Sequence, residues 1–238
     1  FVIDVTAETS STYRSFFSKM VTYGDGYAGI GVGRAAFKPL VDRIADTDIR
    51  LQWFCCDRST GVTDASGKRV TLIRDTKYPV SVEYQTVKFI GTGRDNIKAG
   101  VFSGWELGDY IYLRSEEAYM IKMEALAHKG SADAITELNS FMKTRQPDYN
   151  YTFTNKADLI EEIIYQKRVE FWGEGLEYID NRRLNIPVDR TDETWGAENN
   201  NHFSAGKFRY NQEERPFLYQ LPLSEIENNS QLSPTDQN

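Results

Sequence analysis

Two carboxylates seven residues apart, Glu117 and Glu124, are the side chains whose spacing could carry chemistry. At 3.6 residues per turn, both fall on the apolar stripe of the helix expected around them. Two acids near a base could perform general acid–base catalysis, but a glycosidase holds its carboxylates about 5 to 10 Å apart across an open cleft. Acids on an apolar stripe point between packed helices instead, so they need cationic partners there.

The cations that could neutralise these acids lie on a second expected helix and just before Glu117. Lys167 shares a face with apolar residues of a helix expected over 155–172, and Arg168 flanks that face. Arg114 lies within one turn of Glu117. We therefore predict an ion cluster between helices, with a structural role and no catalytic one, whose members are Arg114, Glu117, Glu124, Lys167 and Arg168.

The sequence contains few residues that could support other catalytic chemistry or bind a metal. His128 and His202 are the two histidines, and neither belongs to a spaced metal motif. Cys55 and Cys56 are adjacent, and neighbouring Cα atoms about 3.8 Å apart are too close for an ordinary disulfide. Residues 24–29 match G-x-G-x-x-G but follow no buried strand, which favours a loop over a dinucleotide site. We expect no metal, no cofactor and no enzyme activity.

The composition is that of a globular, acidic protein rich in aromatic rings. The net charge of −7 repels phosphate backbones and argues against nucleic-acid binding. Aromatic residues make up 13% of the chain, and such rings pack in cores or stack on the faces of sugars. The ligand-binding candidates in the expected loops are the rings Tyr23, Tyr27, Trp53 and Trp105 with the polar neighbours Asp25 and Arg58.

Residues 1–108 predict a variable, loop-rich region with short helices and strands. Helical stripes occupy 10–20 and 34–45. Alternating β-branched and aromatic residues favour strands at Arg50–Phe54, 70–73 and 79–90, with glycines between them.

Residues 109–183 predict a series of helices. Asp109 could cap a helix that runs to Lys129 and stops at Gly130. Further helices are expected over 131–145, over 155–172 behind an Asn155 cap, and over 176–183. The helix from Asp109 to Lys129 and the helix over 131–145 together have the length of a tetratricopeptide unit, although no clean repeat is visible. Residues 184–238 have no sustained period and are expected to form a tail that wraps over the helices.

Three segments in this order resemble the SusD/RagB family. Residues 109–125 are similar to its Arg-x-Ala-Glu-Ala-Tyr-Leu helix, which is followed by Ala-Glu-Ala. Residues 167–183 resemble its Glu-Arg-Arg-x-x-Glu-Leu-x-x-Glu-Gly-x-Arg-x-x-Asp-Leu-x-Arg segment. Residues 221–238 resemble its closing Pro-Ile-Pro-x-x-Glu-Ile-x-x-Asn and terminal Gln-Asn. The family residues Glu, Arg, Arg and Leu are replaced by Gln166, Lys167, Glu177 and Asn181.

The resemblance implies a mainly α fold of tetratricopeptide-like helical hairpins with long irregular loops and a few short strands. It implies one continuous domain over 1–108 and 109–238, with the N-terminal half of the full protein, and its lipidated cysteine, outside this sequence. Family members are nutrient-binding lipoproteins on the surface of the outer membrane in Bacteroides-like bacteria. They capture oligosaccharides, or sometimes peptides, for a TonB-dependent, SusC-like transporter.

Three functions follow as hypotheses. The first is non-catalytic binding of an oligosaccharide or polysaccharide for carbohydrate transport. The second is a protein-interaction scaffold that docks the transporter and holds no ligand site in this chain. The third is a glycoside hydrolase, against which the lack of an obvious acid pair counts.

Overall fold

Helices dominate the part of the chain that the computed structural model describes, which is residues 2–3, 16–20, 35–55, 62–63, 69–70, 84–86, 88–89, 110–214 and 220–236. Contacts between Cα atoms divide the chain into two units, residues 1–173 and 174–238. The predicted mainly α fold with a few short strands is confirmed. The division near residue 108 and the course of the tail over the helices stay predictions.

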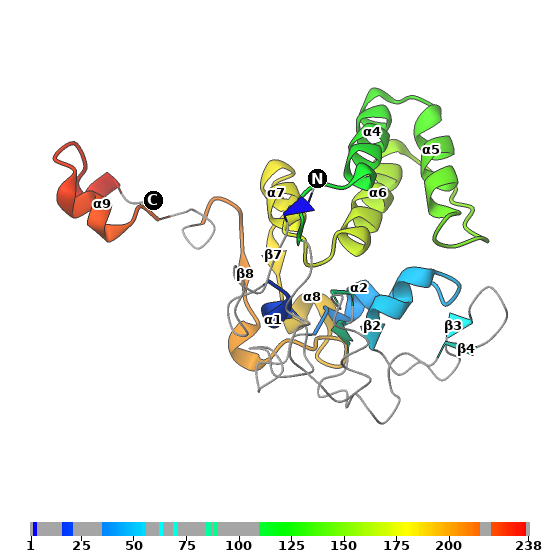
Figure 1. Ribbon diagram of the computed structural model, residues 1–238, viewed down its shortest axis with the longest axis horizontal. Helices are drawn as coiled ribbons and strands as arrows, with labels where there is room; N and C mark the ends of the chain where they lie inside the picture. Colours follow the sequence, from blue (N-terminus) through cyan, green and yellow to red (C-terminus); the bar gives the residue numbers. More distant parts are fainter. Residues whose placement is uncertain are drawn as a thin grey trace. The chain divides into compact units, whose positions relative to one another are not determined.

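Three helices form a layer in the first unit: α4 (Ser115–Lys129), α5 (Asp133–Met142) and α6 (Lys156–Glu170). They lie side by side, with α4 in contact with both others (Figure 1). Gly130 ends α4 with a φ of 71°, and its amide donates to the carbonyls of Ala127 and Leu126. This left-handed conformation suits glycine, so the predicted stop at Gly130 is confirmed.

The start of α6 also follows local sequence rules. The side chain of Asn155 accepts hydrogen bonds from the amides of Ala157 and Asp158, which satisfies two donors that the first turn leaves open. Most side chains from Leu159 to Glu170 are buried, including polar ones. A helix that is buried on several faces lies at the centre of its unit, so its polar groups need partners within the protein.

The predicted start of the α4 helix was wrong. Asp109 lies outside the described residues, and the helix begins at Ser115 after Arg114, whose backbone is extended. Tyr110–Ile111 form the strand β6, which pairs antiparallel with β1 (Val2–Ile3), with Val2 opposite Ile111. Pairing with a segment far away in sequence overrides the helical pattern here.

A second group of short elements packs against α6. It contains α2 (Lys38–Asp42), the 3-10 helix η1 (Ile49–Trp53) and the antiparallel strands β2 (Phe54–Cys55) and β5 (Gln85–Thr86). Their buried side chains share one hydrophobic cluster with the helix, whose members are Ala36, Val41, Ile44, Leu51, Phe54, Tyr84, Tyr165 and Val169. This cluster fixes the segment 36–54 on α6.

The predicted strand at Arg50–Phe54 was wrong over most of its length. The side chain of Asp48 accepts a hydrogen bond from the amide of Arg50 at 2.8 Å and caps η1. It also holds the Arg50 guanidinium, which is 1% exposed. A local cap together with a buried ion pair thus selects a tight helical turn in place of the strand.

The remaining elements of the first unit are short. They are α1 (Phe16–Met20) and the hairpin strands β3 (Val62–Thr63) and β4 (Arg69–Val70), with Val62 opposite Val70. The ring of Phe16 meets those of Phe89 and Tyr110, each at 4.9 Å between centroids.

The second unit begins after Gly173, which has a φ of 77°, and contains α7 (Leu176–Arg183), as predicted from the sequence. The strands β7 (Val188–Asp189) and β8 (Arg209–Tyr210) pair antiparallel around α8 (Asp192–Trp195) and η2 (Ser204–Gly206). The Asp189 carboxylate accepts from Thr191 and Thr194 and so fixes the start of α8. The short helices α9 (Leu223–Asn228) and η4 (Pro234–Asp236) follow.

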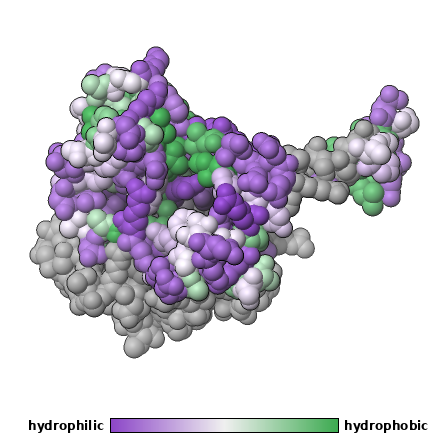
Figure 2. Space-filling model, turned by 180° about the vertical axis from the view of Figure 1, so that it is seen from behind, coloured by the Kyte–Doolittle hydropathy of each residue, from purple (hydrophilic) through white to green (hydrophobic). Residues whose placement is uncertain are grey.

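Large apolar side chains remain on the surface at and before α4. Figure 2 shows hydrophobic atoms among hydrophilic ones on the helical layer. The exposed residues include Tyr112, Leu113, Tyr119 and Ile121, each with more than half of its surface open. Among the described residues, no helix combines the length and apolar character needed to cross a membrane.

Candidate functional site

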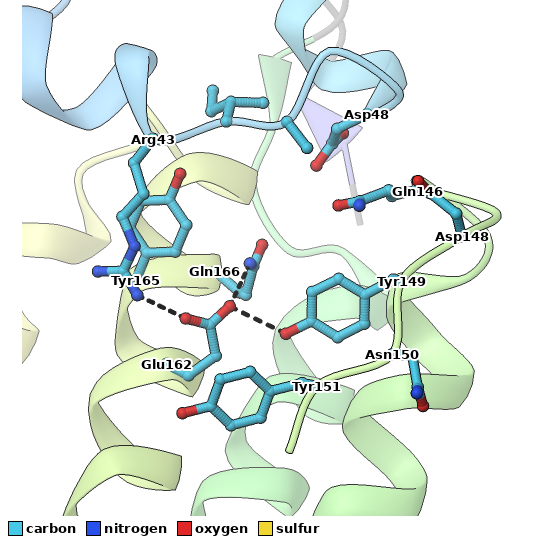
Figure 3. A pocket seen from close by; sticks show the side chains of 12 residues that line it. Arg43, Asp48, Gln146, Asp148, Tyr149, Asn150, Tyr151, Glu162, Tyr165 and Gln166 are labelled. Carbon is cyan, nitrogen blue, oxygen red and sulfur yellow. Dashed lines mark hydrogen bonds and ion pairs between the residues drawn. The ribbon is translucent and has the colours of Figure 1, made fainter. Parts of the chain in front are cut away.

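A polar pocket of about 340 Å³ lies within the first unit. Three segments line it: residues 43–48 after α2, the loop 146–151 between α5 and α6, and one face of α6 over 162–166 (Figure 3). The loop begins where α5 ends and is held back on it, because the side chain of Asn139 bonds the backbone of Tyr151 in both directions. The pocket is therefore built on helices whose ends are fixed.

Glu162 is the carboxylate of this pocket, and it is 6% exposed. One oxygen accepts from the Arg43 guanidinium at 2.5 Å. The other accepts from the Tyr149 hydroxyl at 2.9 Å and from the Gln166 amide at 2.7 Å (Figure 3). Burial, followed by the nearby Glu162 charge, raises the pKa of Tyr149, so its hydroxyl stays protonated and donates. Glu162 is thus fully engaged by protein donors, which is a structural arrangement.

Three tyrosine rings form the less polar part of the pocket. The rings of Tyr149 and Tyr151 stack with centroids 6.4 Å apart and an angle of 17°. The Arg43 guanidinium covers the Tyr165 ring at 3.9 Å from its centroid. The hydroxyls of Tyr151 and Tyr165 donate to the backbone carbonyls of Asp158 and Leu40. All three hydroxyls are anchored to the protein, so the rings are held in fixed positions.

A network of buried charges lies behind the pocket. Arg50 donates through Nη2 to the side-chain oxygen of Gln166 at 2.5 Å and through Nη1 to Glu170 at 3.4 Å. Glu170 is 2% exposed and also accepts from Arg114 and Arg145, each at 3.1 Å. Burial alone would raise the pKa of Glu170, but the hydrogen bond and charge of Arg145, with the charges of Arg50 and Arg114, lower it below 4.5.

The predicted ion cluster is divided between two places in the structure. Lys167 Nζ and Glu124 Oε2 lie 3.4 Å apart, and both side chains are 6% exposed. Arg114 forms its ion pair with Glu170 instead. Its Nη1 also lies 3.8 Å from Oε2 of Glu116, which is an acidic residue of α4.

Glu117 does not join these pairs. Glu117 is half-buried and forms no ion pair with any described residue, so its predicted membership in the cluster is not what the structure gives. One residue of helical rotation separates Glu116 from Glu117, and only Glu116 reaches the cations. Arg168 is half-buried on α6, next to Lys167.

The sequence did not single out Arg50, Arg145, Glu162 or Glu170 as partners. One signal for three of these groups is present: Glu162, Gln166 and Glu170 follow one another at intervals of four along α6, which places them on one face. The positions of the arginines carry no comparable local signal.

Five of the six predicted ligand-binding residues, Tyr23, Asp25, Tyr27, Arg58 and Trp105, lie outside the described residues. Trp53 is described and half-buried at the edge of the hydrophobic cluster. The Lys88 ammonium lies 4.7 Å from the centre of its ring, and the Trp53 carbonyl accepts from Thr86. Trp53 is not part of the pocket lined by residues 43–48, 146–151 and 162–166.

No group of three or more His, Cys, Asp or Glu side chains with the placement of metal ligands occurs in the described part of the chain.

The described residues form a mainly α fold with a few short strands and long irregular connections. Comparison with known proteins identifies the family that has this fold. The sequence model of the SusD family matches residues 18–238, and the chain belongs to this family. The crystal structure of a SusD-like carbohydrate binding protein from Bacteroides vulgatus aligns with 98% of this chain at a TM-score of 0.61 and 20% identity. At that identity the likeness shows a common fold. This chain covers 47% of the length of that protein. No curated protein matches this chain.

Proposed function

We propose that this chain binds an oligosaccharide or polysaccharide nutrient without chemical change, for delivery to a SusC-like TonB-dependent transporter. The observation that carries the proposal is the match to the SusD family over residues 18–238. Members of this family are in general lipoproteins on the cell surface of the outer membrane that pair with such a transporter. The structure of similar fold is named for carbohydrate binding.

The arrangement of the described acids supports binding over catalysis. Glu124, Glu162 and Glu170 are buried and accept from cations or other donors of the protein. A glycosidase needs two carboxylates facing a sugar across an open cleft. The loop rings Tyr23, Tyr27, Trp53 and Trp105, with Asp25 and Arg58, remain our candidates for contact with the glycan.

The proposal is tested by native gel electrophoresis of the 238-residue chain through gels that contain starch, xylan, mannan or pectin. Retardation by at least one polysaccharide, with no release of reducing sugar on prolonged incubation, is the expected result. Release of reducing sugar would favour a hydrolase. Migration that no polysaccharide changes would remove the support for a glycan site in this chain.

Trp53 offers a test with a matched control. We expect Trp53→Ala to lower the affinity for the retarding polysaccharide about fivefold, because a stacked ring contributes about 1 kcal/mol. It also lowers the melting temperature, since Trp53 packs against the hydrophobic cluster. Trp172 is half-buried against the same cluster, so Trp172→Ala controls for lost packing alone. Equal retardation of the two variants would show that Trp53 has only a packing role.

The exposed apolar residues at α4 favour a second candidate function, docking to the transporter. Tyr112, Leu113, Tyr119 and Ile121 lie close together in the sequence, and each has more than half of its surface exposed. Exposed apolar side chains occur at protein interaction sites. Absence of retardation by any polysaccharide, together with capture of a purified SusC-like transporter by the same chain, would favour this scaffold role.

A further inference from the structure

The pocket formed by residues 43–48, 146–151 and 162–166 has the features of a site for a small ligand. Its volume of about 340 Å³ lies near the lower end of the roughly 300–1,000 Å³ of ligand pockets. Of the six loop candidates the structure describes Trp53, and Trp53 does not line this pocket.

The charged side chains of the pocket wall are already bound by other groups of the protein. Glu162 pairs with Arg43, and Asp48 pairs with Arg50 at 2.7 Å. Asp148 accepts from the Thr47 hydroxyl at 2.7 Å, and hydrogen bonds from Thr47 and Gln146 lower its pKa. A charged ligand would have to compete with these pairs, whereas a neutral ligand can bind beside them.

The same wall offers groups that suit hydroxyls. The Gln146 side chain extends from the loop toward the pocket (Figure 3), whereas both ends of the Gln166 amide are already bound, to Arg50 and to Glu162. An amide both donates and accepts, as does a sugar hydroxyl. The anchored, half-buried ring of Tyr151 supplies flat apolar surface for the C–H groups of a sugar.

We propose that this pocket binds one small neutral sugar, a mono- or disaccharide, in the helical layer. The inference rests on the proposed function for the carbohydrate class of the ligand, whereas the location of the site comes from the pocket itself. Gln146 bonds the sugar hydroxyls, Tyr151 packs against the ring, and the paired charges of Arg43 with Glu162 and of Arg50 with Asp48 disfavour ionic ligands.

The test is saturation-transfer NMR on the 238-residue chain with glucose, galactose, mannose, xylose and glucuronate, each alone. We expect transfer to at least one neutral sugar and none, or much less, to glucuronate. Titration should then give a dissociation constant about tenfold weaker for Gln146→Ala and for Tyr151→Ala, as loss of one contact of this kind predicts. Tyr178→Ala removes an exposed tyrosine that does not line the pocket and should leave binding unchanged.

Melting curves of the variants keep the result interpretable. Gln146 lies in a half-buried loop position and tolerates alanine more readily than Tyr151, so one folded variant is enough. Transfer to no neutral sugar, preferential transfer to glucuronate, or undiminished binding by folded Gln146→Ala would overturn the inference. Retardation by a polysaccharide in native gels, combined with any of these outcomes, would leave the proposed function standing and reject the pocket alone.

Discussion

Glu170→Gln should lower the free energy of unfolding by about 3 kcal/mol or more, since removal of one partner from a buried ion pair has this cost. Glu170 is 2% exposed and accepts from Arg50, Arg114 and Arg145 at 3.4, 3.1 and 3.1 Å. Without its charge, three guanidinium groups face one another around a neutral amide. Urea denaturation of the purified variant, followed by tryptophan fluorescence, measures the loss.

Glu116→Gln is the matched control for this variant. Glu116 contacts two of the same arginines, Arg145 at 3.6 Å and Arg114 at 3.8 Å, but its side chain is 31% exposed. A pair that water can screen contributes below about 1 kcal/mol, so this variant should unfold close to the parent chain. Equal destabilisation by the two substitutions would contradict the special role of Glu170.

The same carboxylate gives the stability a defined dependence on pH. The pKa of Glu170 is lowered in the folded chain from its ordinary 4.5, despite burial. A carboxylate with a lowered folded pKa contributes stability that is fully present above its unfolded pKa and is lost as pH falls through the folded one. The parent chain should therefore lose stability more steeply below pH 4.5 than Glu170→Gln does. Parallel curves for the two proteins would contradict this prediction.

Helix ends were the part of this fold that the sequence could predict best. Gly130 and Asn155 act through their own backbone and the next few residues, so their effect can be derived from the local sequence. The helix over 176–183 was found in the same way. Asp109 misled the prediction of α4 because the neighbouring Tyr110–Ile111 pair with a strand more than 100 residues away.

The pocket could not be assembled from the sequence because its parts meet only after folding. Arg43 is 119 residues from Glu162, and Arg50 is 116 from Gln166. Long-range ion pairs leave no periodic signal, since either partner alone looks like an ordinary surface charge. A weaker signal existed in Tyr149 and Tyr151, whose spacing of two places their rings on one side of an extended segment.

The second large effect should arise at the buried pair between α4 and α6. Lys167 and Glu124 are 3.4 Å apart and each 6% exposed, so Lys167→Met leaves a buried carboxylate that loses its ammonium partner. We expect the free energy of unfolding to fall by about 3–5 kcal/mol. The His128 ring, 3.7 Å from Glu124, is half exposed and compensates for little of this loss.

The double variant Glu124→Leu/Lys167→Met distinguishes a missing charge from a missing shape. It removes both charges and keeps apolar volume in the helical layer, so it should be more stable than Lys167→Met alone. Lys122→Met provides the surface control, because Lys122 pairs with Glu137 across α4 and α5 at 2.6 Å while half exposed. Its effect should be much smaller, since water screens that pair. A double variant as unstable as Lys167→Met would mean that α4 and α6 depend on the packing of the lysine side chain and not on neutralisation of Glu124.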